Sequence, residues 1–548
     1  MKRINFINTL LASAMSASLM GIAHADPVNE SPEKWYANGE AAIQTAKKIQ
    51  ANKHKAKNII LFVADGMGVS TTTAARILEG QLRGESGEEN QLSFEVMPYV
   101  ALSKTYNTNQ QTPDSAGTMT AMMTGIKSKA GVISVNQNVF RGDCASSKGS
   151  ELTTFLEQAE MAGLSTGVVT TARLTHATPA ATYAHAPERN WEDDHDLTSE
   201  AIDNGCKDIA RQLIEFPYGN GLEVALGGGR RNFWPRNMAD LEDAGKTGER
   251  DDQRNLTEEW VENYDNAFFV WNKAQFDNIN ANNTDHLLGL FDRSHMEYSQ
   301  DRGDDIGGEP SLTEMTNKAI DILQKNNKGY FLMVESGRVD HGHHAGNAYR
   351  ALTDTIEFSN AVKSAMQKTD PRETLIIVTA DHSHVFTIAG YPTRGNPILG
   401  KVVGNDSRGV AKDSFSMAKD GMPYTTVSYA NGLGYASLET GGDTRYKLPE
   451  QAGRVADLSS IDTEDEGFHQ EALVPLSSET HAAEDVAIYA GGPGAYLMHG
   501  VQEQNYIYHV MNKASKIERR MARTHGDHKK NGPGKVKWAN ADEDRSND

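Results

Sequence analysis

Three continuous apolar runs in the chain each lead directly into an acidic residue. Residues 59–64 precede Asp65, residues 330–334 precede Glu335, and residues 374–380 precede Asp381. Apolar runs without alternation are typical of strands that are buried on both faces of a parallel sheet. Because open α/β sheets bind ligands at the carboxyl ends of their strands, we expect these acids to lie together. An acid after a strand can also cap the next helix, but the threefold recurrence favours a polynuclear metal site.

The remaining periodic segments support an α/β fold with a mostly parallel sheet. We expect helices at 31–52, 71–79 (with Ser70 as its cap), 313–325 and 499–516, and strands at 98–103, 166–171, 223–226 and 486–490. The segment 236–300 is polar, with apolar islands at 267–271 and 287–291, and is predicted to be surface structure laid over the core.

Composition divides the chain into five parts. Residues 1–25 have the basic start, apolar stretch and small-residue cleavage site of a secretory signal. The alternative is a membrane anchor, but the apolar stretch is short and rich in Ala and Ser. The other expected parts are an N-terminal helix and arm (26–56), an α/β core (57–387 and 479–518), an inserted β-rich subdomain (388–478) and a disordered polar tail (519–548).

The charge of the chain limits its partners. The 548 residues carry a net charge of −20, and removal of residues 1–25 takes away two basic residues and no acid, leaving −22. Such a charge argues against nucleic-acid binding and repels anionic substrates except where a local positive field attracts them. No later apolar run is long enough to span a bilayer. We therefore expect an exported protein, periplasmic or secreted.

The chain contains two cysteines, Cys144 and Cys206. In an exported protein a pair of cysteines indicates one disulfide. The alternative is two free buried thiols, which is the less favoured interpretation in an oxidising compartment. Neither cysteine lies near the acid and histidine clusters in the sequence.

The segment that follows Glu335 contains further metal ligands. Asp340 and His344 are four residues apart, so one helical turn would place them on the same face. The pairs Asp381–His382 and Glu479-Thr-His481 need partners as well. Together these carboxylates and imidazoles are sufficient for three ions.

A candidate nucleophile follows Pro113. Proline often starts a helix, and the small residues after it allow a close-packed helix with Ser115 in its first turn. The free amide groups there would stabilise an alkoxide or a bound phosphate. The alternative is that Ser115 caps the helix.

These motifs, taken together and in order, resemble the alkaline phosphatases. The resemblance covers about residues 57–516 and rests on Asp65-Gly-Met-Gly, Pro113-Asp-Ser115-Ala-Gly-Thr, His176-Ala-Thr178-Pro, Val339-Asp340-His341-Gly-His-His344, Thr379-Ala-Asp381-His382-Ser-His and Glu479-Thr-His481. The Asp-His-Gly-His-His form is similar to that of the animal tissue enzymes and of some secreted bacterial relatives. The fold implied is a large central sheet between helices with a crown-like insertion, which residues 388–478 would supply.

The resemblance also implies roles for individual residues. Two zinc ions would be held by Asp340, His344 and His481 and by Asp65, Asp381 and His382, and one magnesium ion by Asp65, Thr178 and Glu335. Arg189 would bind two phosphate oxygens, a task suited to guanidinium, with His176 and His341 beside the substrate and the magnesium. His185, His343 and His384 are expected to be structural or surface residues.

The activity implied is hydrolysis of small phosphate monoesters at alkaline pH. Ser115, activated by the second zinc ion, would form a phosphoserine that zinc-bound water then cleaves. A homodimer is expected, with no membrane anchor. The rival activities are those of a phosphodiesterase or sulfatase, which Thr178, Glu335 and Arg189 disfavour, and a metal-dependent binding protein or inactive relative, which the complete set of catalytic residues disfavours.

A fourth metal site is a further expectation from the resemblance. The animal enzymes carry a calcium site with a motif that here reads Phe291-Asp292 and Glu309-Pro310-Ser311-Leu312. The two carboxylates and the Phe291 carbonyl would be hard oxygen ligands, and Asp240 or Glu242 could join them. The alternative is that these acids are solvated loop residues.

Overall fold

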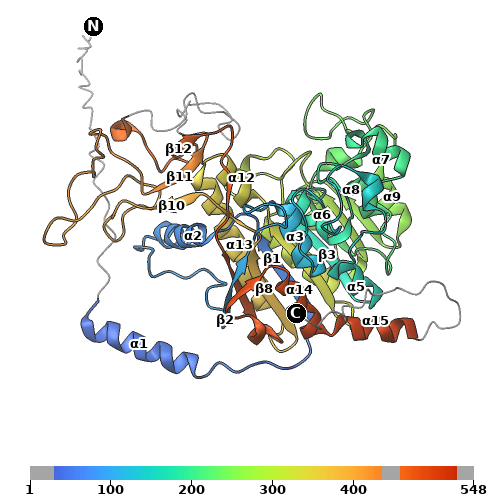
Figure 1. Cartoon of the computed structure of the whole chain (residues 1–548), viewed down its shortest axis with the longest axis horizontal. Coiled ribbons are helices and arrows are strands. Elements are labelled where there is room, and N and C mark those ends of the chain that lie inside the picture. Colours follow the sequence, from blue (N-terminus) through green and yellow to red (C-terminus); the bar gives the residue numbers. More distant parts are fainter. Residues whose placement is uncertain (1–29, 435–456, 527–548) are drawn as a thin grey trace, which may run out of the picture.

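The computed structural model describes residues 30–434 and 457–526 (Figure 1). The predicted signal at 1–25 lies outside the described residues, as do part of the predicted insertion and most of the predicted tail. Within the described residues, no helix is both long and apolar enough to cross a membrane.

A ten-stranded sheet forms the centre of the molecule. In spatial order its strands are β15 (Val501–Glu503), β2 (Tyr99–Lys104), β14 (Val486–Gly491), β8 (Thr374–Ala380), β1 (Asn58–Ala64), β7 (Tyr330–Ser336), β3 (Ser165–Arg173), β4 (Val224–Gly228), β6 (His286–Leu290) and β5 (Ala267–Val270). Strand β14 is antiparallel to β2 and β8, and the other described pairs in this sheet are parallel. The predicted α/β class and mostly parallel sheet are confirmed.

Both faces of the sheet are buried, which explains the continuous apolar runs. In β1, Ile59 and Leu61 join the core on one face, and Ile60 and Phe62 join the core on the other. The first core includes residues of α3 (Ser115–Thr124), α5 (Phe155–Met161), α6 (Ala177–Tyr183) and α14 (Tyr506–Ser515). The second includes residues of α2 (Val69–Leu82), α11 (Leu312–Leu323) and α13 (Ala348–Lys368).

The strand register places the three acids at one edge. Ala64 pairs with Ser336 of β7 and with Ala380 of β8. Asp65 and Asp381 therefore leave the sheet at the same level, and Glu335 lies two residues before that level on β7. Helix α12 (Arg338–His344) begins two residues after β7 ends. The adjacent strands β8, β1 and β7 therefore deliver their acids to a single region.

The start of α2 differs from the prediction. The helix begins at Val69 with Gly68 as its N-cap, so Ser70 lies inside the helix and the predicted cap is wrong. The helix begins this early because the turn after β1 is tight: the Gly68 N–H donates to the Gly66 carbonyl, and the Thr72 N–H donates to the Gly68 carbonyl. The glycine turn therefore leaves no room for a separate capping residue.

The N-terminal helix α1 (Pro32–Ala46) is shorter than expected and stands apart from the body of the molecule (Figure 1). The Ser31 hydroxyl accepts from the Lys34 N–H and caps it, and none of its residues is buried. Trp35 and Tyr36 are exposed on it. Among the residues that the structure describes, this apolar surface of the helix is therefore left exposed.

The polar segment at 236–300 is more than surface structure. Its two apolar islands form β5 and β6, which extend the main sheet at one edge, and every residue of β6 is buried. The prediction of surface structure is therefore wrong. The two strands are only four and five residues long and lie between Asn-rich stretches, which is why the sequence pattern did not identify them. Short apolar runs of this kind do not reveal whether they join a sheet.

The C-terminal prediction also needs correction. The single helix expected at 499–516 is replaced by the edge strand β15 and then α14. A further helix, α15 (Ile517–Gly526), follows, so the first residues of the predicted disordered tail are helical. Ile517 is fully buried and anchors the start of this helix.

The described part of the predicted insertion contains a small sheet of β10 (Phe386–Ile388), β11 (Val427–Gly432) and β12 (Ala472–Pro475). At its base β9 (Ser383–His384) pairs with β13 (His481–Ala482), and His481 lies opposite His384. The two ends of the insertion are therefore joined next to the metal-ligand motifs.

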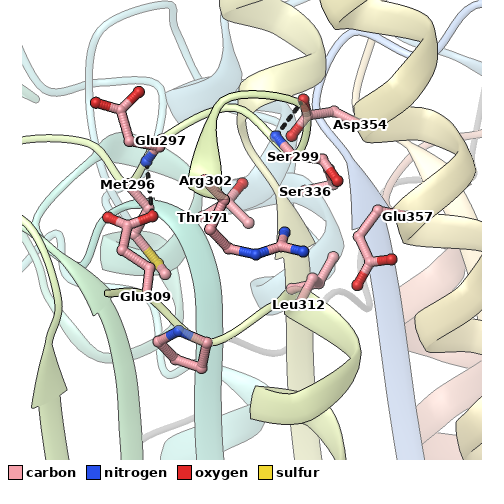
Figure 2. Close-up of a pocket in the computed structure, with 11 residues that line it drawn as sticks. Thr171, Met296, Glu297, Ser299, Arg302, Glu309, Leu312, Ser336, Asp354 and Glu357 are labelled. Atoms are coloured by element: carbon pink, nitrogen blue, oxygen red, sulfur yellow. Dashed lines mark hydrogen bonds between the residues drawn. The ribbon is translucent and has the colours of Figure 1, made fainter. Parts of the chain in front are cut away.

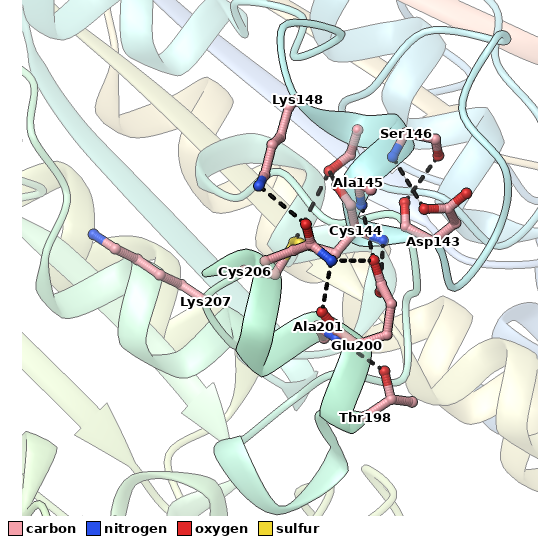
Figure 3. Close-up of a disulfide and its surroundings, with 12 residues drawn as sticks. Asp143, Cys144, Ala145, Ser146, Lys148, Thr198, Glu200, Ala201, Cys206 and Lys207 are labelled. Atoms are coloured by element: carbon pink, nitrogen blue, oxygen red, sulfur yellow. Dashed lines mark hydrogen bonds between the residues drawn. A yellow bond between two sulfur atoms is a disulfide. The ribbon is translucent and has the colours of Figure 1, made fainter.

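Short helices cover the remaining segments: α4 (Cys144–Ser147), α7 (Ser199–Asn204), α8 (Ile209–Ile214), α9 (Leu256–Asn263) and α10 (Lys273–Asn278). A disulfide joins Cys144 to Cys206, as predicted (Figure 3). The Glu200 carboxylate accepts from the Cys144 and Ala145 N–H groups, and so holds α7 against the start of α4. Cys144 and Cys206 also pack with Trp191 in a small apolar cluster.

We expect replacement of both cysteines by serine to lower the free energy of unfolding by about 2–5 kcal/mol. The reason is that the disulfide connects residues 62 positions apart and restricts the unfolded chain. Urea unfolding of the two proteins, each with and without reductant, measures the difference. Equal stabilities without reductant would contradict the assignment, and reductant should leave the double variant unchanged.

Candidate active site

Three predicted ligands meet where α12 faces the base of the insertion. Asp340 Oδ1 lies 3.3 Å from His344 Nε2 and 3.3 Å from His481 Nε2, and the two Nε2 atoms are 3.0 Å apart. The Nδ1–H groups of the histidines donate to carbonyl oxygens, His344 to Glu479 at 2.7 Å and His481 to Pro113 at 2.8 Å. Both Nε2 atoms therefore present lone pairs to each other, an arrangement that a cation between them would stabilise.

A second group forms around the end of β8. His382 Nε2 lies 3.2 Å from Asp65 Oδ1 and 3.2 Å from Asp381 Oδ2, and the three residues are fully buried or nearly so. Ser115 Oγ lies 3.2 Å from the same His382 nitrogen and 3.5 Å from Asp65 Oδ1. The predicted nucleophile thus borders this group.

A third group shares Asp65. Asp65, Glu335 and His176 offer ligand atoms that all lie within 4.8 Å of one another, and Thr178 Oγ1 donates to Asp65 Oδ2 at 3.4 Å. Glu335 Oε1 and His176 Nδ1 are buried without a hydrogen-bond partner. Thr170 donates its hydroxyl to the other Glu335 oxygen. Orphaned polar atoms of this kind are expected where a hydrated ion belongs.

The charges of these groups show why cations fit. Burial raises the pKa of Asp65 well above its usual range, and repulsion from Asp381, Asp340 and Glu335 raises it further. Burial, more than any neighbour, raises the pKa of Glu335 to about 8. Several buried carboxylates without nearby cationic partners are costly, and bound metal ions would remove that cost.

The donor atoms match the expected metals. Two groups combine imidazole nitrogen with carboxylate oxygen, the set that suits zinc. The third includes hard carboxylate and hydroxyl oxygens, which suit magnesium. The His176 imidazole lies beside this group, but its Nε2 accepts from Arg189, so it is not counted as a ligand. The residues present therefore fit two zinc ions and one magnesium ion.

Ser115 occupies the first turn of α3 and is not its cap. Asp114 is the N-cap, and its Oδ1 accepts from the Gly117 N–H at 3.1 Å. The alternative in which Ser115 caps the helix is therefore wrong. The Ser115 hydroxyl remains in the field of the helix start, where a negative charge is stabilised.

Arg189 lies between Asp114 and His176. Its Nη1 donates to Asp114 Oδ2 at 3.2 Å and its Nη2 donates to His176 Nε2 at 3.1 Å. Arg338 Nη1 likewise donates to His341 Nδ1 at 3.1 Å. Because guanidinium only donates, His176 carries its proton on Nδ1 and His341 on Nε2. Burial and then the neighbouring arginine lower the pKa of each histidine well below its usual range.

The three histidines expected to be structural or on the surface are all largely enclosed. His185 Nε2 lies 2.6 Å from Glu157 Oε1, and His343 lies between Thr71 and Tyr429 with both ring nitrogens paired. His384 is buried beside the first ligand group. The structural interpretation holds for His185 and His343, and the surface interpretation is wrong for all three.

Sequence reasoning missed the role of His384 and Glu479. His384 Nε2 lies 2.9 Å from Asp340 Oδ1, and its Nδ1 lies 2.6 Å from Glu479 Oε2. Burial disfavours a charged ring, but the two carboxylates outweigh it and raise the pKa of His384 to about 10. The pattern Asp-His-Ser-His was a usable signal, because His384 follows the ligand His382 by two residues and lies on the short strand that begins directly after it.

The close packing around His384 also explains why residue 66 is a glycine. A Cβ atom at position 66 would lie 2.3 Å from His384 Nε2, and the backbone of Gly66 has a φ of +76°. Its N–H donates to Asp381 Oδ1 at 3.1 Å. Only glycine allows the turn after β1, the close approach of His384 and this hydrogen bond at one position.

A separate acidic cluster lies in the 236–309 region. Ligand atoms of Glu242, Asp292 and Asp305 lie within 4.8 Å of one another. Burial first, and then neighbouring carboxylates, raise the pKa of Asp305 to about 7 and that of Glu309 well above its usual range. Burial raises the pKa of Asp292 to about 6.

Two further residues of the predicted calcium motif can be placed. Glu309 lies on the wall of a small pocket next to the cluster, where its Oε2 accepts from the Glu297 N–H (Figure 2). Phe291 is fully buried and its ring packs on Phe276. Asp240 instead accepts from Nε and Nη2 of Arg230, so it is already paired. Asp305 was not singled out from the sequence.

Comparison with known sequences gives a consistent result. The sequence profile described as alkaline phosphatase matches residues 56–517. The tissue-nonspecific alkaline phosphatase of Gallus gallus is 44% identical over 520 residues, which covers 93% of this chain and 94% of that protein. An alkaline phosphatase of Gadus morhua is 43% identical over 493 residues, covering 89% of this chain and 97% of that one.

Solved structures share the fold. The alkaline phosphatase from the Antarctic bacterium TAB5 has a TM-score of 0.55 at 23% identity, with 84% of this chain and 99% of that chain covered. The Thermus thermophilus alkaline phosphatase has a TM-score of 0.58 at 22% identity, with 88% and 98% covered.

We expect His384→Ala to weaken zinc binding by the Asp340 group about 10- to 100-fold, because it removes the side chain that orients Asp340. Chelator competition on the purified protein, with total zinc determined by elemental analysis, measures the loss. His185→Ala is the matched control, since His185 also pairs with a buried carboxylate but lies outside the three ligand groups. Unchanged zinc affinity in His384→Ala would refute an orienting role.

Proposed function

Since the chain belongs to the alkaline phosphatase family and is a phosphomonoester hydrolase, we propose that it acts through a phosphoserine on Ser115 with two zinc ions and one magnesium ion. The observation that carries the proposal is the position of Ser115 Oγ, 3.2 Å from His382 Nε2 at the start of α3. A nucleophile so placed borders a metal-ligand group and a helix N-terminus at once. The substrates are small phosphate monoesters, hydrolysed at alkaline pH.

The ligands of each ion follow from the three groups. Asp340, His344 and His481 would hold one zinc ion. Asp65, Asp381 and His382 would hold the other, and Asp65, Thr178 and Glu335 the magnesium ion. When bound, the ions would supply Lewis-acid stabilisation of the phosphate oxygens and of the oxygens that enter and leave.

The residues of the chain perform the displacement. Ser115 Oγ attacks phosphorus and gives up its proton to solvent, the bond from phosphorus to the alcohol oxygen breaks, and that oxygen takes up a proton from water. The alcohol departs and the phosphoryl group remains on Ser115. Water then cleaves the phosphoserine, which releases inorganic phosphate and returns the hydroxyl.

Arg189 orients the phosphoryl group in both steps. Its guanidinium is held by Asp114 on one side and His176 on the other, which fixes the fork for two phosphate oxygens. Asp114 also caps the helix that carries Ser115. The nucleophile and the phosphate-binding group therefore share one anchor, which favours in-line geometry.

We also propose a homodimer in the periplasm or the medium. An isolated helix of 15 residues is marginal in water, and within the described part of the chain α1 leaves Trp35 and Tyr36 exposed. A second copy of the chain would cover this face. Sedimentation of the protein with and without residues 26–46 tests the proposal. The inserted subdomain at 388–478 is proposed to form the crown.

We expect Ser115→Ala to lower kcat roughly 10³-fold or more while zinc content stays unchanged, because the metals are held by other side chains. Acid quenching of the unchanged enzyme during turnover of a labelled aryl phosphate should leave label on the peptide that contains Ser115. Ser70→Ala, which changes a half-buried serine in the first turn of α2 on the other face of the sheet, is the control. Label on any other peptide would disprove the nucleophile.

We propose that the acidic cluster binds calcium through Asp292, Glu309 and the Phe291 carbonyl, with Glu242 and Asp305 beside them. The orphaned oxygens Asp305 Oδ2 and Glu309 Oε1 support a cation there. Their raised pKa values indicate mutual repulsion that a hard divalent ion would relieve.

Calcium at 100 times its Kd should raise the free energy of unfolding by about 2.7 kcal/mol, because it binds only the folded state. Asp292→Ala should abolish that gain and leave zinc content intact, whereas Asp304→Ala, an exposed acid nearby, should keep it. Thermal unfolding with and without calcium provides the measurement. Absence of any gain in the unchanged protein would rule the site out.

A further inference from the structure

A second arginine lies beside the phosphate-binding one. Arg141 forms a two-pronged ion pair with Glu188, from Nε to Oε2 and from Nη2 to Oε1, each at 2.8 Å. Glu188 immediately precedes Arg189 in the chain, and its side chain is 16% exposed while that of Arg141 is 48% exposed. The pair therefore forms part of the surface next to Arg189.

The negative charge of Glu188 would disfavour phosphate binding nearby, and Arg141 neutralises it. An unpaired carboxylate in the segment that carries Arg189 would weaken the local positive field and repel the incoming dianion. The ion pair with Arg141 neutralises this carboxylate, and both its oxygens are occupied by the guanidinium fork. Arg189 is thereby left for Asp114, His176 and the substrate.

Arg141 also contacts the backbone that holds Arg189. Its guanidinium passes over Gly131, where an added Cβ would lie 2.3 Å from Arg141 Nε. The Gly131 carbonyl accepts from the Arg189 N–H at 2.9 Å, and the Gly131 N–H donates to Asp114 Oδ2 at 2.8 Å. The same glycine thus joins Arg141, Arg189 and the cap of the nucleophile helix.

The two segments are linked at further points. The Gly142 N–H donates to the Pro187 carbonyl at 2.9 Å, and Ile133 and Ala186 form an antiparallel bridge. Cys144, three residues after Arg141, is fixed by its disulfide (Figure 3). Arg141 therefore meets Glu188 from a fixed backbone, which reduces the entropy that a surface ion pair usually costs.

We propose that Arg141 is a positioning residue for phosphate binding, which acts by neutralising Glu188 and by packing on Gly131 so that Arg189 stays directed at the substrate. The proposal rests on the assignment of phosphate binding to Arg189. It concerns the affinity for the phosphate group and not the reactivity of Ser115. Arg141 itself does not contact the reacting atoms.

The test compares R141M, E188Q and the double variant R141M/E188Q, using inorganic phosphate as the probe in competitive inhibition and calorimetry. R141M should weaken phosphate binding and raise KM about three- to tenfold, because the Glu188 carboxylate loses the cation that neutralises it. The kcat and the zinc content should stay unchanged. E188Q should have nearly the same phosphate affinity and KM as the unchanged protein. The double variant should recover most of the affinity, since the competing charge is gone.

Two reference variants separate the possible results. R83M removes an arginine of similar exposure that pairs with Glu85 just after the end of α2, and should leave phosphate affinity unchanged. R189A should weaken phosphate binding; if it does not, the assignment of Arg189 fails. If R189A weakens binding while R141M does not, or if the double variant is as weak as R141M, the positioning role of Arg141 is overturned and that of Arg189 stands.

Discussion

The accumulation of buried negative charge at one edge of the sheet is the constraint on which this molecule depends. Three adjacent parallel strands end at the same level, and their register brings Asp65, Glu335 and Asp381 together where water is largely excluded. No apolar packing can compensate such a group. The surrounding elements are accordingly arranged to offset it: imidazoles from the base of the insertion, the start of α3, and three groups of ligand atoms that fit cations.

Hydrogen bonds from behind fix the orientation of the ligands in the Asp340 group. The carbonyl oxygens of Glu479 and Pro113 fix the tautomers of two histidines, while His384 links the Glu479 side chain to Asp340. Glu479 therefore acts on the first ligand group in two ways, through its backbone and through its carboxylate. The base of the insertion, where β9 pairs with β13, is part of the site and more than a connection to the subdomain above it.

The central part of the fold follows from the sequence because it depends on long apolar runs that end in acids. The rest depends on features that a single sequence does not display. Strands β5 and β6 are short and separated by polar residues, so only the pairing partner in space identifies them. The start of α2 depends on the turn at Gly66, whose necessity comes from His384, distant in the sequence. In the same way Asp305 joins the acidic cluster, and Arg141 meets Glu188, only after the chain has folded.

The order of the ligands along the chain has a consequence for biosynthesis. Asp65 directly follows the first core strand, whereas His481 follows the insertion and precedes the last strands of the sheet. A chain that emerges from its amino end must therefore expose its acids long before the final imidazole is available. The Asp340 group can close only after the insertion has been synthesised. A product truncated before His481 would lack this ligand and retain uncompensated repulsion at the centre of its sheet.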